Sequence, residues 1–79
     1  MSKLKEMRIK RKLTQKQLAE ASNINLRTLQ CYEQKFKDIN GAKLKTLIKL
    51  CEVLDCNLID IIEEDDAEFV ELIKNVSLR

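Results

Sequence analysis

The chain has 79 residues, 44% hydrophobic and 35% charged, a composition typical of one small soluble domain with a modest core and not of a disordered chain. Its apolar runs are shorter than the roughly 20 residues of a membrane span, and its basic N-terminus lacks the apolar core of a signal peptide, so we expect a cytoplasmic protein without a membrane partner. The three cysteines have no CxxC spacing and no accompanying histidine, which argues against a disulfide framework or a zinc site.

The net charge of +2 hides a division of the chain into a basic and an acidic part. Residues 1–49 hold 13 Lys and Arg against 4 Asp and Glu, whereas residues 50–79 hold 2 against 9. A positive surplus is what binding to the polyanion DNA requires, although charged helices also need solvated faces. We expect the basic part to meet nucleic acid and the acidic part to face away from it.

The first helix is predicted over about residues 2–12, with Ser2 as its cap. A partial inner face is formed by Leu4, Met7 or Arg8, and Ile9. The basic residues 10–12 close the helix, where the negative end of the helix dipole favours positive charge.

The stretch Thr14 to Glu33 predicts two short helices joined by a tight turn. The first covers residues 15–21 with Thr14 as its cap, and the second covers residues 26–34 with Asn25 as its cap. Between them, Asn23 is the residue that best tolerates a left-handed backbone. This arrangement is a helix-turn-helix, whose second helix suits the major groove of DNA.

Residues 35–41 have no helical period and are predicted to form a loop that is anchored in the core by Phe36 and Ile39. The helix predicted over residues 42–54 has the clearest apolar pattern of the chain, formed by Leu44, Leu47, Ile48, Cys51 and Leu54. Asn57 is expected to cap a fifth helix over residues 58–63. Cys51 and Cys56 are expected to be small buried residues.

These predictions divide the chain into a DNA-binding domain, residues 1–64, and a C-terminal helix, residues 65–79. The apolar stripe of this tail consists of Phe69, Leu72, Ile73 and Val76. The stripe either folds back on its own domain or docks on a second subunit. We expect a homodimer, because two copies that read two half-sites multiply the specificity of one small domain.

The sequence resembles the phage repressor/Cro-type helix-turn-helix family, also called the xenobiotic-response-element family, over about residues 3–63. The matching positions in the central motif are Thr14, Gln15, Leu18, Ala19, Ile24, Thr28, Leu29, Tyr32 and Glu33. The chain departs from the family pattern at Asn23, where glycine is usual, at Asp55-Cys56, and at Leu26, where many members carry a polar base reader. The resemblance implies an all-α, five-helix lambda-repressor-like bundle, here followed by the amphipathic C-terminal helix.

The resemblance also implies roles for single residues. Arg8 would pair with Glu33 and so tie the first helix to the third, the alternative being an exposed arginine. The resemblance implies phosphate contacts by Gln15, Thr28, Lys35, Lys37 and Lys43, and Lys16 and Asn25 are further candidates beside them. Glutamine at the start of a helix suits this role on chemical grounds, because its amide and the free backbone N–H groups face the same anion.

The candidate base readers lie on the outer side of the second motif helix: Leu26, Arg27, Gln30 and Cys31. The fork of Arg27 matches the O6 and N7 atoms of guanine, although the same side chain also suits a phosphate. Leu26 suits a thymine methyl group, and Cys31 offers a weak apolar contact or a site of oxidation.

The sequence has no glycine-rich phosphate loop and no pairing of a nucleophile with a base, so we expect no enzyme, no cofactor and no small-molecule site. The expected function is a sequence-specific DNA-binding transcriptional regulator, a bacterial or phage-encoded repressor that binds an inverted-repeat operator as a dimer. The alternatives are a protein-interaction module, such as an antitoxin or a regulator partner, and the DNA-binding domain of a larger sensor.

Overall fold

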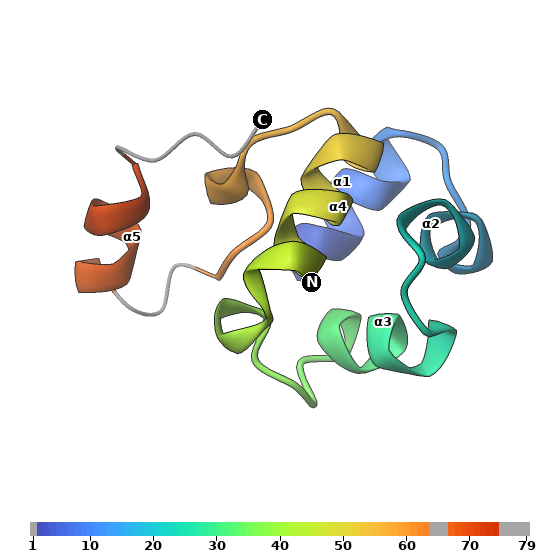
Figure 1. Ribbon diagram of the computed structural model, residues 1–79, viewed down its shortest axis with the longest axis horizontal. Helices are drawn as coiled ribbons and strands as arrows, with labels where there is room; N and C mark the ends of the chain where they lie inside the picture. The colour runs from blue at the N-terminus through green and yellow to red at the C-terminus, as the bar shows by residue number, and fades with distance from the viewer. Residues whose placement is uncertain (1, 64–66, 75–79) are drawn as a thin grey trace.

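The computed structural model describes residues 2–63 and 67–74, excluding the side chains of residues 67 and 69. These residues form only helices and turns: α1 (Lys3–Lys10), α2 (Gln15–Ser22), α3 (Leu26–Glu33), the 3₁₀ turn η1 (Ile39–Gly41), α4 (Leu44–Leu54), the 3₁₀ turn η2 (Leu58–Asp60) and α5 (Ala67–Ile73). The prediction of an all-α fold is confirmed. In Figure 1, α1 to α4 gather into a bundle and α5 stands to one side of it.

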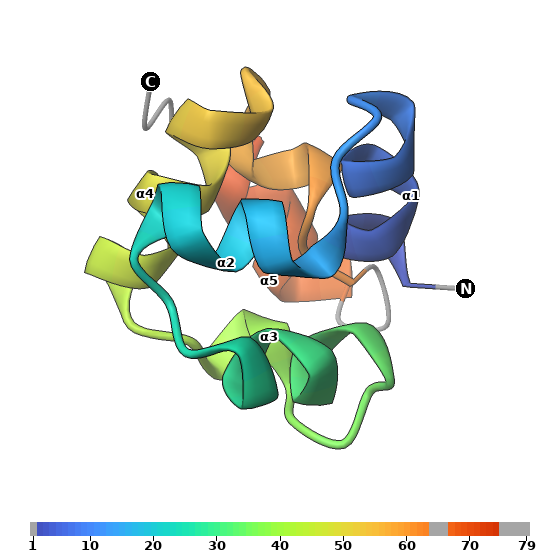
Figure 2. The same cartoon turned by 90° about the vertical axis from the view of Figure 1, so that its right-hand side faces the viewer.

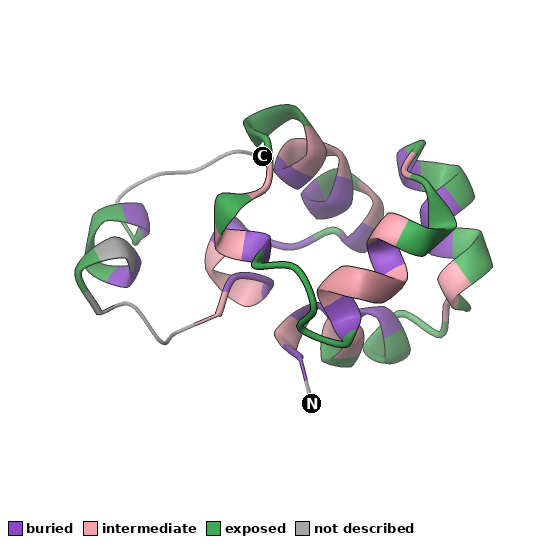
Figure 3. Cartoon of the chain, turned by 90° about the horizontal axis from the view of Figure 1, so that it is seen from below, coloured by how far each residue is buried: buried purple, intermediate pink, exposed green. Residues whose placement is uncertain are grey.

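The core of the bundle collects one to three fully covered apolar side chains from each of α1 to α4, and two more from the segment that follows η2. Those with no exposed surface are Leu4, Leu18, Leu29, Leu50, Cys51, Leu54, Ile61 and Ile62. Figure 3 shows the buried positions on the inward sides of the helices, with exposed positions along their outer turns. Burial of this apolar surface is the main force that holds the short helices together, because helices of 8 to 11 residues are marginal in isolation.

Helix α1 begins after Ser2, whose hydroxyl oxygen accepts the backbone N–H of Lys5 at 3.0 Å. The helix ends at Lys10, so two of the three basic residues expected to close it lie beyond its end. Its buried positions are Leu4 and Arg8, four residues apart on one side. Ile9 lies one position further round and is half exposed, so its expected place on the inner face is wrong.

Helix α4 begins at Leu44 and not at residue 42. The predicted apolar pattern holds from Leu47 onward, but Leu44 is 59% exposed because it lies in the first turn, ahead of the buried stretch. The cap residue at the end of α4 is Asp55, which has a left-handed backbone at φ 49° and ψ 56°.

The loop after α3 has only one of its two expected anchors. Ile39 is buried, but Phe36 is 78% exposed, so its expected place in the core is wrong. The backbone gives the reason. Lys35 is left-handed at φ 63°, and the N–H groups of Phe36 and Lys37 both bond to the carbonyl of Cys31. This tight reversal directs the Phe36 side chain outward.

The fifth helix expected over residues 58–63 is reduced to the single 3₁₀ turn η2. The Asp60 carboxylate accepts the backbone N–H of Asn57 at 2.9 Å and closes this turn on itself. The chain then leaves the helical path because Glu63 pairs with a distant residue. The Glu63 N–H donates to Oδ1 of Asn40 at 2.9 Å, and Nδ2 of Asn40 donates to the Glu63 carbonyl at 3.0 Å.

Helix α5 packs next to η2. Its inward positions are Val70 and Ile73, whereas Leu72 is 64% exposed. The predicted apolar stripe is therefore split: Ile73 joins the core and Leu72 faces solvent. The Phe69 side chain and Val76 lie outside the described residues.

Candidate nucleic-acid interface

Helices α2 and α3 lie one above the other on a single side of the molecule, with α1 to their right and α4 to their left in Figure 2. Thr14 and Gln17 start α2 with a reciprocal pair of hydrogen bonds: Gln17 N–H to Thr14 Oγ1 at 3.0 Å, and Thr14 N–H to Gln17 Oε1 at 2.8 Å. This capping box satisfies two of the free donors of the first turn. It fixes where α2 begins, and so where its N-terminus points.

The turn between the two helices depends on two asparagines. Asn23 has the left-handed backbone that the sequence predicted, at φ 56° and ψ 44°. The Asn25 side-chain oxygen accepts the N–H groups of Arg27 at 2.8 Å and Thr28 at 3.4 Å, and so caps α3. Two positions of the turn therefore set the direction of the second helix.

The outer side of α3 carries the four candidate base readers. Arg27 and Leu26 are exposed, whereas Gln30 and Cys31 are half-buried. The opposite side is anchored by the buried residues Leu29 and Glu33. The Arg27 guanidinium makes no ion pair or hydrogen bond within residues 2–63 and 67–74, so it is available to a partner.

Arg8 and Glu33 form an ion pair beneath this face. Arg8 Nε lies 2.7 Å from Glu33 Oε2 and Arg8 Nη2 lies 3.0 Å from Glu33 Oε1. The side chains are only 10% and 1% exposed. Arg8 Nη1 also donates to the Leu13 carbonyl at 2.8 Å. The bidentate pair joins α1 to α3, and the bond to Leu13 holds the segment between α1 and α2. Together these bonds orient α2 and α3 relative to α1.

Gln15, the first residue of α2, lies against the same pair. Its Nε2 donates to Glu33 Oε1 at 3.1 Å, and its Oε1 accepts from Gln30 Nε2 at 3.4 Å. A side-chain amide has two N–H groups, so one N–H of Gln15 is left for a phosphate. The bonds from Gln15 to Glu33 and Gln30 have no signal in the sequence, because they join residues 18 and 15 positions apart.

The other candidate phosphate contacts are spread along the rim of this face. Lys16, Lys37 and Lys43 are exposed, Asn25 is exposed while capping α3, and Thr28 is half-buried. Lys35 differs from the other lysines, because its Nζ lies 3.7 Å from Glu63 Oε2. A phosphate would have to compete with this carboxylate for Lys35.

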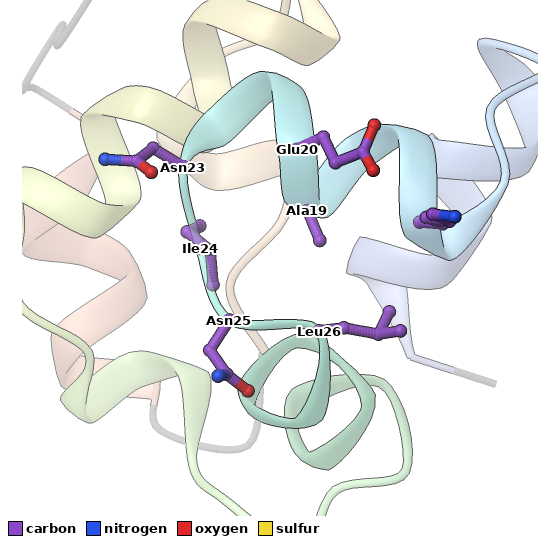
Figure 4. Close-up of a pocket in the computed structure, with 7 residues that line it drawn as sticks. Ala19, Glu20, Asn23, Ile24, Asn25 and Leu26 are labelled. Carbon is purple, nitrogen blue, oxygen red and sulfur yellow. The ribbon is translucent and has the colours of Figure 1, made fainter.

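A shallow depression of about 500 Å³ lies where α2 meets α3. Figure 4 shows Ala19 pointing down from α2 and Glu20 extending sideways from the same helix, Ile24 and Asn25 in the turn, and Leu26 extending from the start of α3. The depression is open and not an enclosed ligand cavity. It forms part of the helix-turn-helix surface.

Arg11 is a positioning residue that sequence reasoning missed. Its Nε donates to the Leu54 carbonyl at 2.6 Å and its Nη2 to the Asp55 carbonyl at 3.0 Å. These carbonyls belong to the end of α4, where a helix leaves acceptors unpaired. Arg11 therefore fastens the end of α1 to the end of α4, which no local pattern indicates.

Cys51 and Cys56 lie in the core, and Cys31 is half-buried. A hydrogen bond with Cys51, together with burial, raises the pKa of the Cys56 thiol. Cys56 therefore stays neutral and behaves as a small apolar residue. Within the described part of the chain, no group of three or more His, Cys, Asp or Glu side chains is placed to hold a metal ion.

None of the helices described is long and apolar enough to cross a membrane. A sequence model of the helix-turn-helix family matches residues 4–61. No curated protein and no solved structure matches the chain. The matched range runs from the first core residue of α1 to the segment that follows η2.

Proposed function

The chain belongs to the lambda repressor/Cro-like family of DNA-binding helix-turn-helix regulators, and we propose that it is a sequence-specific repressor that binds an inverted-repeat operator as a homodimer. One domain of this size contacts few base pairs. Two copies related by a two-fold axis contact two half-sites, and together they recognise a longer and more specific sequence.

The observation that carries this proposal is the free outer side of α3. Arg27 and Leu26 are exposed at the start of this helix, while Leu29 and Glu33 hold its other side in the core. Recognition helices of this type contact base edges with residues near their N-termini. Arg27 is our candidate for a guanine, Leu26 for a thymine methyl group, and Gln30 and Cys31 for bases deeper in the groove.

The phosphate contacts that we propose surround this helix. Gln15 and Lys16 lie in the first turn of α2, where free backbone N–H groups and the helix dipole favour an anion. Lys37 and Lys43 are exposed beyond the end of α3, where a second run of phosphates would pass. Thr28, Asn25 and Lys35 complete the proposed set.

The test is binding to duplex DNA in two stages. Purified protein is first titrated with random-sequence duplexes over a range of salt concentrations. We expect affinity to fall steeply with salt, with a log–log slope of about 0.9 per phosphate contact. Selection from a randomised pool should then enrich one sequence arranged as an inverted repeat. Absence of binding at low salt would contradict the proposal.

Exposed apolar side chains favour a second candidate function, docking to another protein. Leu72 on α5 and Phe36 in the loop after α3 are both largely exposed. An adaptor or antitoxin that uses this fold would bind its partner through such residues. Replacing both Phe36 and Leu72 by serine would separate the two functions. Salt-dependent binding to DNA should remain in this double variant, whereas docking to a partner protein through these residues should be lost.

A further inference from the structure

We infer that a chain of side-chain hydrogen bonds from Glu33 through Gln15 fixes the amide of Gln30 in the orientation that recognises adenine. This inference rests on the proposed function and adds to it a positioning residue, Gln15, and a base preference. Its starting point is the contact of Gln15 with the buried Arg8–Glu33 pair.

The partners of Gln15 distinguish the two ends of its amide. The Glu33 carboxylate is held by two nitrogens of Arg8, and a carboxylate can only accept hydrogen bonds. The atom of Gln15 that lies 3.1 Å from Glu33 Oε1 must therefore be its nitrogen. Its oxygen then points the other way, toward α3.

The orientation of Gln15 in turn determines that of Gln30. The Gln15 oxygen is an acceptor, so the atom of Gln30 that faces it must be the donor Nε2, at 3.4 Å. This distance is long for a hydrogen bond, so it is the weaker of the two links. With its nitrogen held on one side, Gln30 keeps one N–H group and its oxygen for a partner.

The free N–H group and the oxygen of Gln30 match one base edge of the major groove better than the others. Adenine presents an acceptor, N7, beside a donor, the N6 amino group, and an amide matches both at once. Guanine presents two acceptors, N7 and O6, so the Gln30 oxygen would face an acceptor. An amide free to rotate would adapt more readily to other edges. The link to Gln15 therefore acts against bases other than adenine.

The experiment is selection from a randomised duplex pool with the wild-type chain and three variants. Gln30→Ala removes the reading amide, and Gln15→Ala removes the link but leaves Gln30 in place. Gln34→Ala replaces an exposed glutamine next to Glu33 and is the matched control. Affinity for random-sequence duplex is measured in parallel for each protein.

We expect an adenine preference of roughly ten-fold at one position of each half-site in the wild type. Gln30→Ala should remove it, Gln15→Ala should reduce it at least about three-fold, and Gln34→Ala should leave it unchanged. Because Gln15 is also a candidate phosphate contact, its loss should weaken binding to all sequences as well. A uniform loss of affinity in Gln15→Ala with the adenine preference intact would overturn the inference.

The free protein gives a second readout, independent of DNA. The hydrogen-bonded side-chain amide proton of Gln15 and that of Gln30 should exchange with water more slowly than those of Gln34 in NMR spectra, and Gln15→Ala should speed exchange of the Gln30 proton. Fast exchange at Gln30 in the wild type would also overturn the inference. If the wild type binds no duplex at any salt concentration, the proposed DNA-binding function is wrong, and the role of Gln30 in recognising adenine is wrong with it.

Discussion

Arg8 and Glu33 are charged residues placed where the bundle otherwise holds apolar side chains, and the Glu33 side chain is only 1% exposed. Removing one partner leaves the other charge in a low-dielectric site without its compensating bonds. We predict that Arg8→Ala lowers the free energy of unfolding by about 3 kcal/mol, as measured by urea denaturation.

The matched control is Lys74→Ala, which breaks the exposed pair with Glu71. Exposed pairs of this kind contribute about 0.5 kcal/mol or less, so this variant should unfold close to the wild type. An Arg8→Ala variant as stable as Lys74→Ala would mean that the buried pair does not hold α1 to α3.

Arg27 is the residue on which proposed selectivity depends most. Its side chain is exposed, so Arg27→Ala should leave the thermal unfolding midpoint within experimental error of the wild type. Loss of a bidentate contact to guanine should cost about 1–3 kcal/mol on the selected site and much less on random duplex. Competition binding between the two duplexes measures the difference. A retained site preference would show that Arg27 contacts a phosphate instead.

At the scale of elements, α1 to α4 end in the same way. Each is followed by a residue with positive φ that is not glycine: Lys12, Asn23, Lys35 and Asp55. In each case a backbone N–H beyond the helix bonds to a carbonyl five residues back, as in Leu13 to Arg8 and Cys56 to Cys51. Glycine adopts this conformation without strain, but a side chain does not.

These helix ends predict a stabilising substitution. Lys12 is exposed with φ 60°, and Lys12→Gly should raise the free energy of unfolding by about 1 kcal/mol because it relieves the left-handed strain. Lys12→Ala removes the same charge but keeps a Cβ atom, so it should not stabilise the protein. The unfolding midpoints of the two variants are compared by thermal melts. Equal midpoints would contradict the claim that Lys12 is strained by its left-handed backbone.

The helix-turn-helix was the most predictable part of the chain. Thr14 and Asn25 as caps and Asn23 as the left-handed residue depend on neighbours within three positions, and the structure has all three. Phe36, Leu44 and the fifth helix were mispredicted because an apolar side chain does not reveal whether another element covers it. At residues 58–63 the long-range pairing of Asn40 with Glu63 overrides the helical pattern.

At the scale of the whole molecule, α5 has two apolar sides with different surroundings: Ile73 lies in the core and Leu72 lies in solvent. If two copies associate through α5, Leu72→Glu should convert the dimer to a monomer without unfolding it, because a charge in an apolar contact is costly. Sedimentation equilibrium measures the mass. Leu44→Glu, at another exposed leucine outside α5, is the control. If Leu44→Glu dissociates the dimer and Leu72→Glu does not, the interface lies at α4 and not at α5.

The sequence by itself determined the helical class, the place of the helix-turn-helix and the split of charge between the two parts of the chain, because these follow from local spacing, caps and composition. Only the tertiary structure decided that Gln15 lies between Glu33 and Gln30, that Arg11 fastens the end of α4, and that Phe36 and Leu72 face solvent. The physical reason is that these contacts join residues far apart in the chain, and the packing of the helices alone brings them within hydrogen-bonding distance or leaves them uncovered.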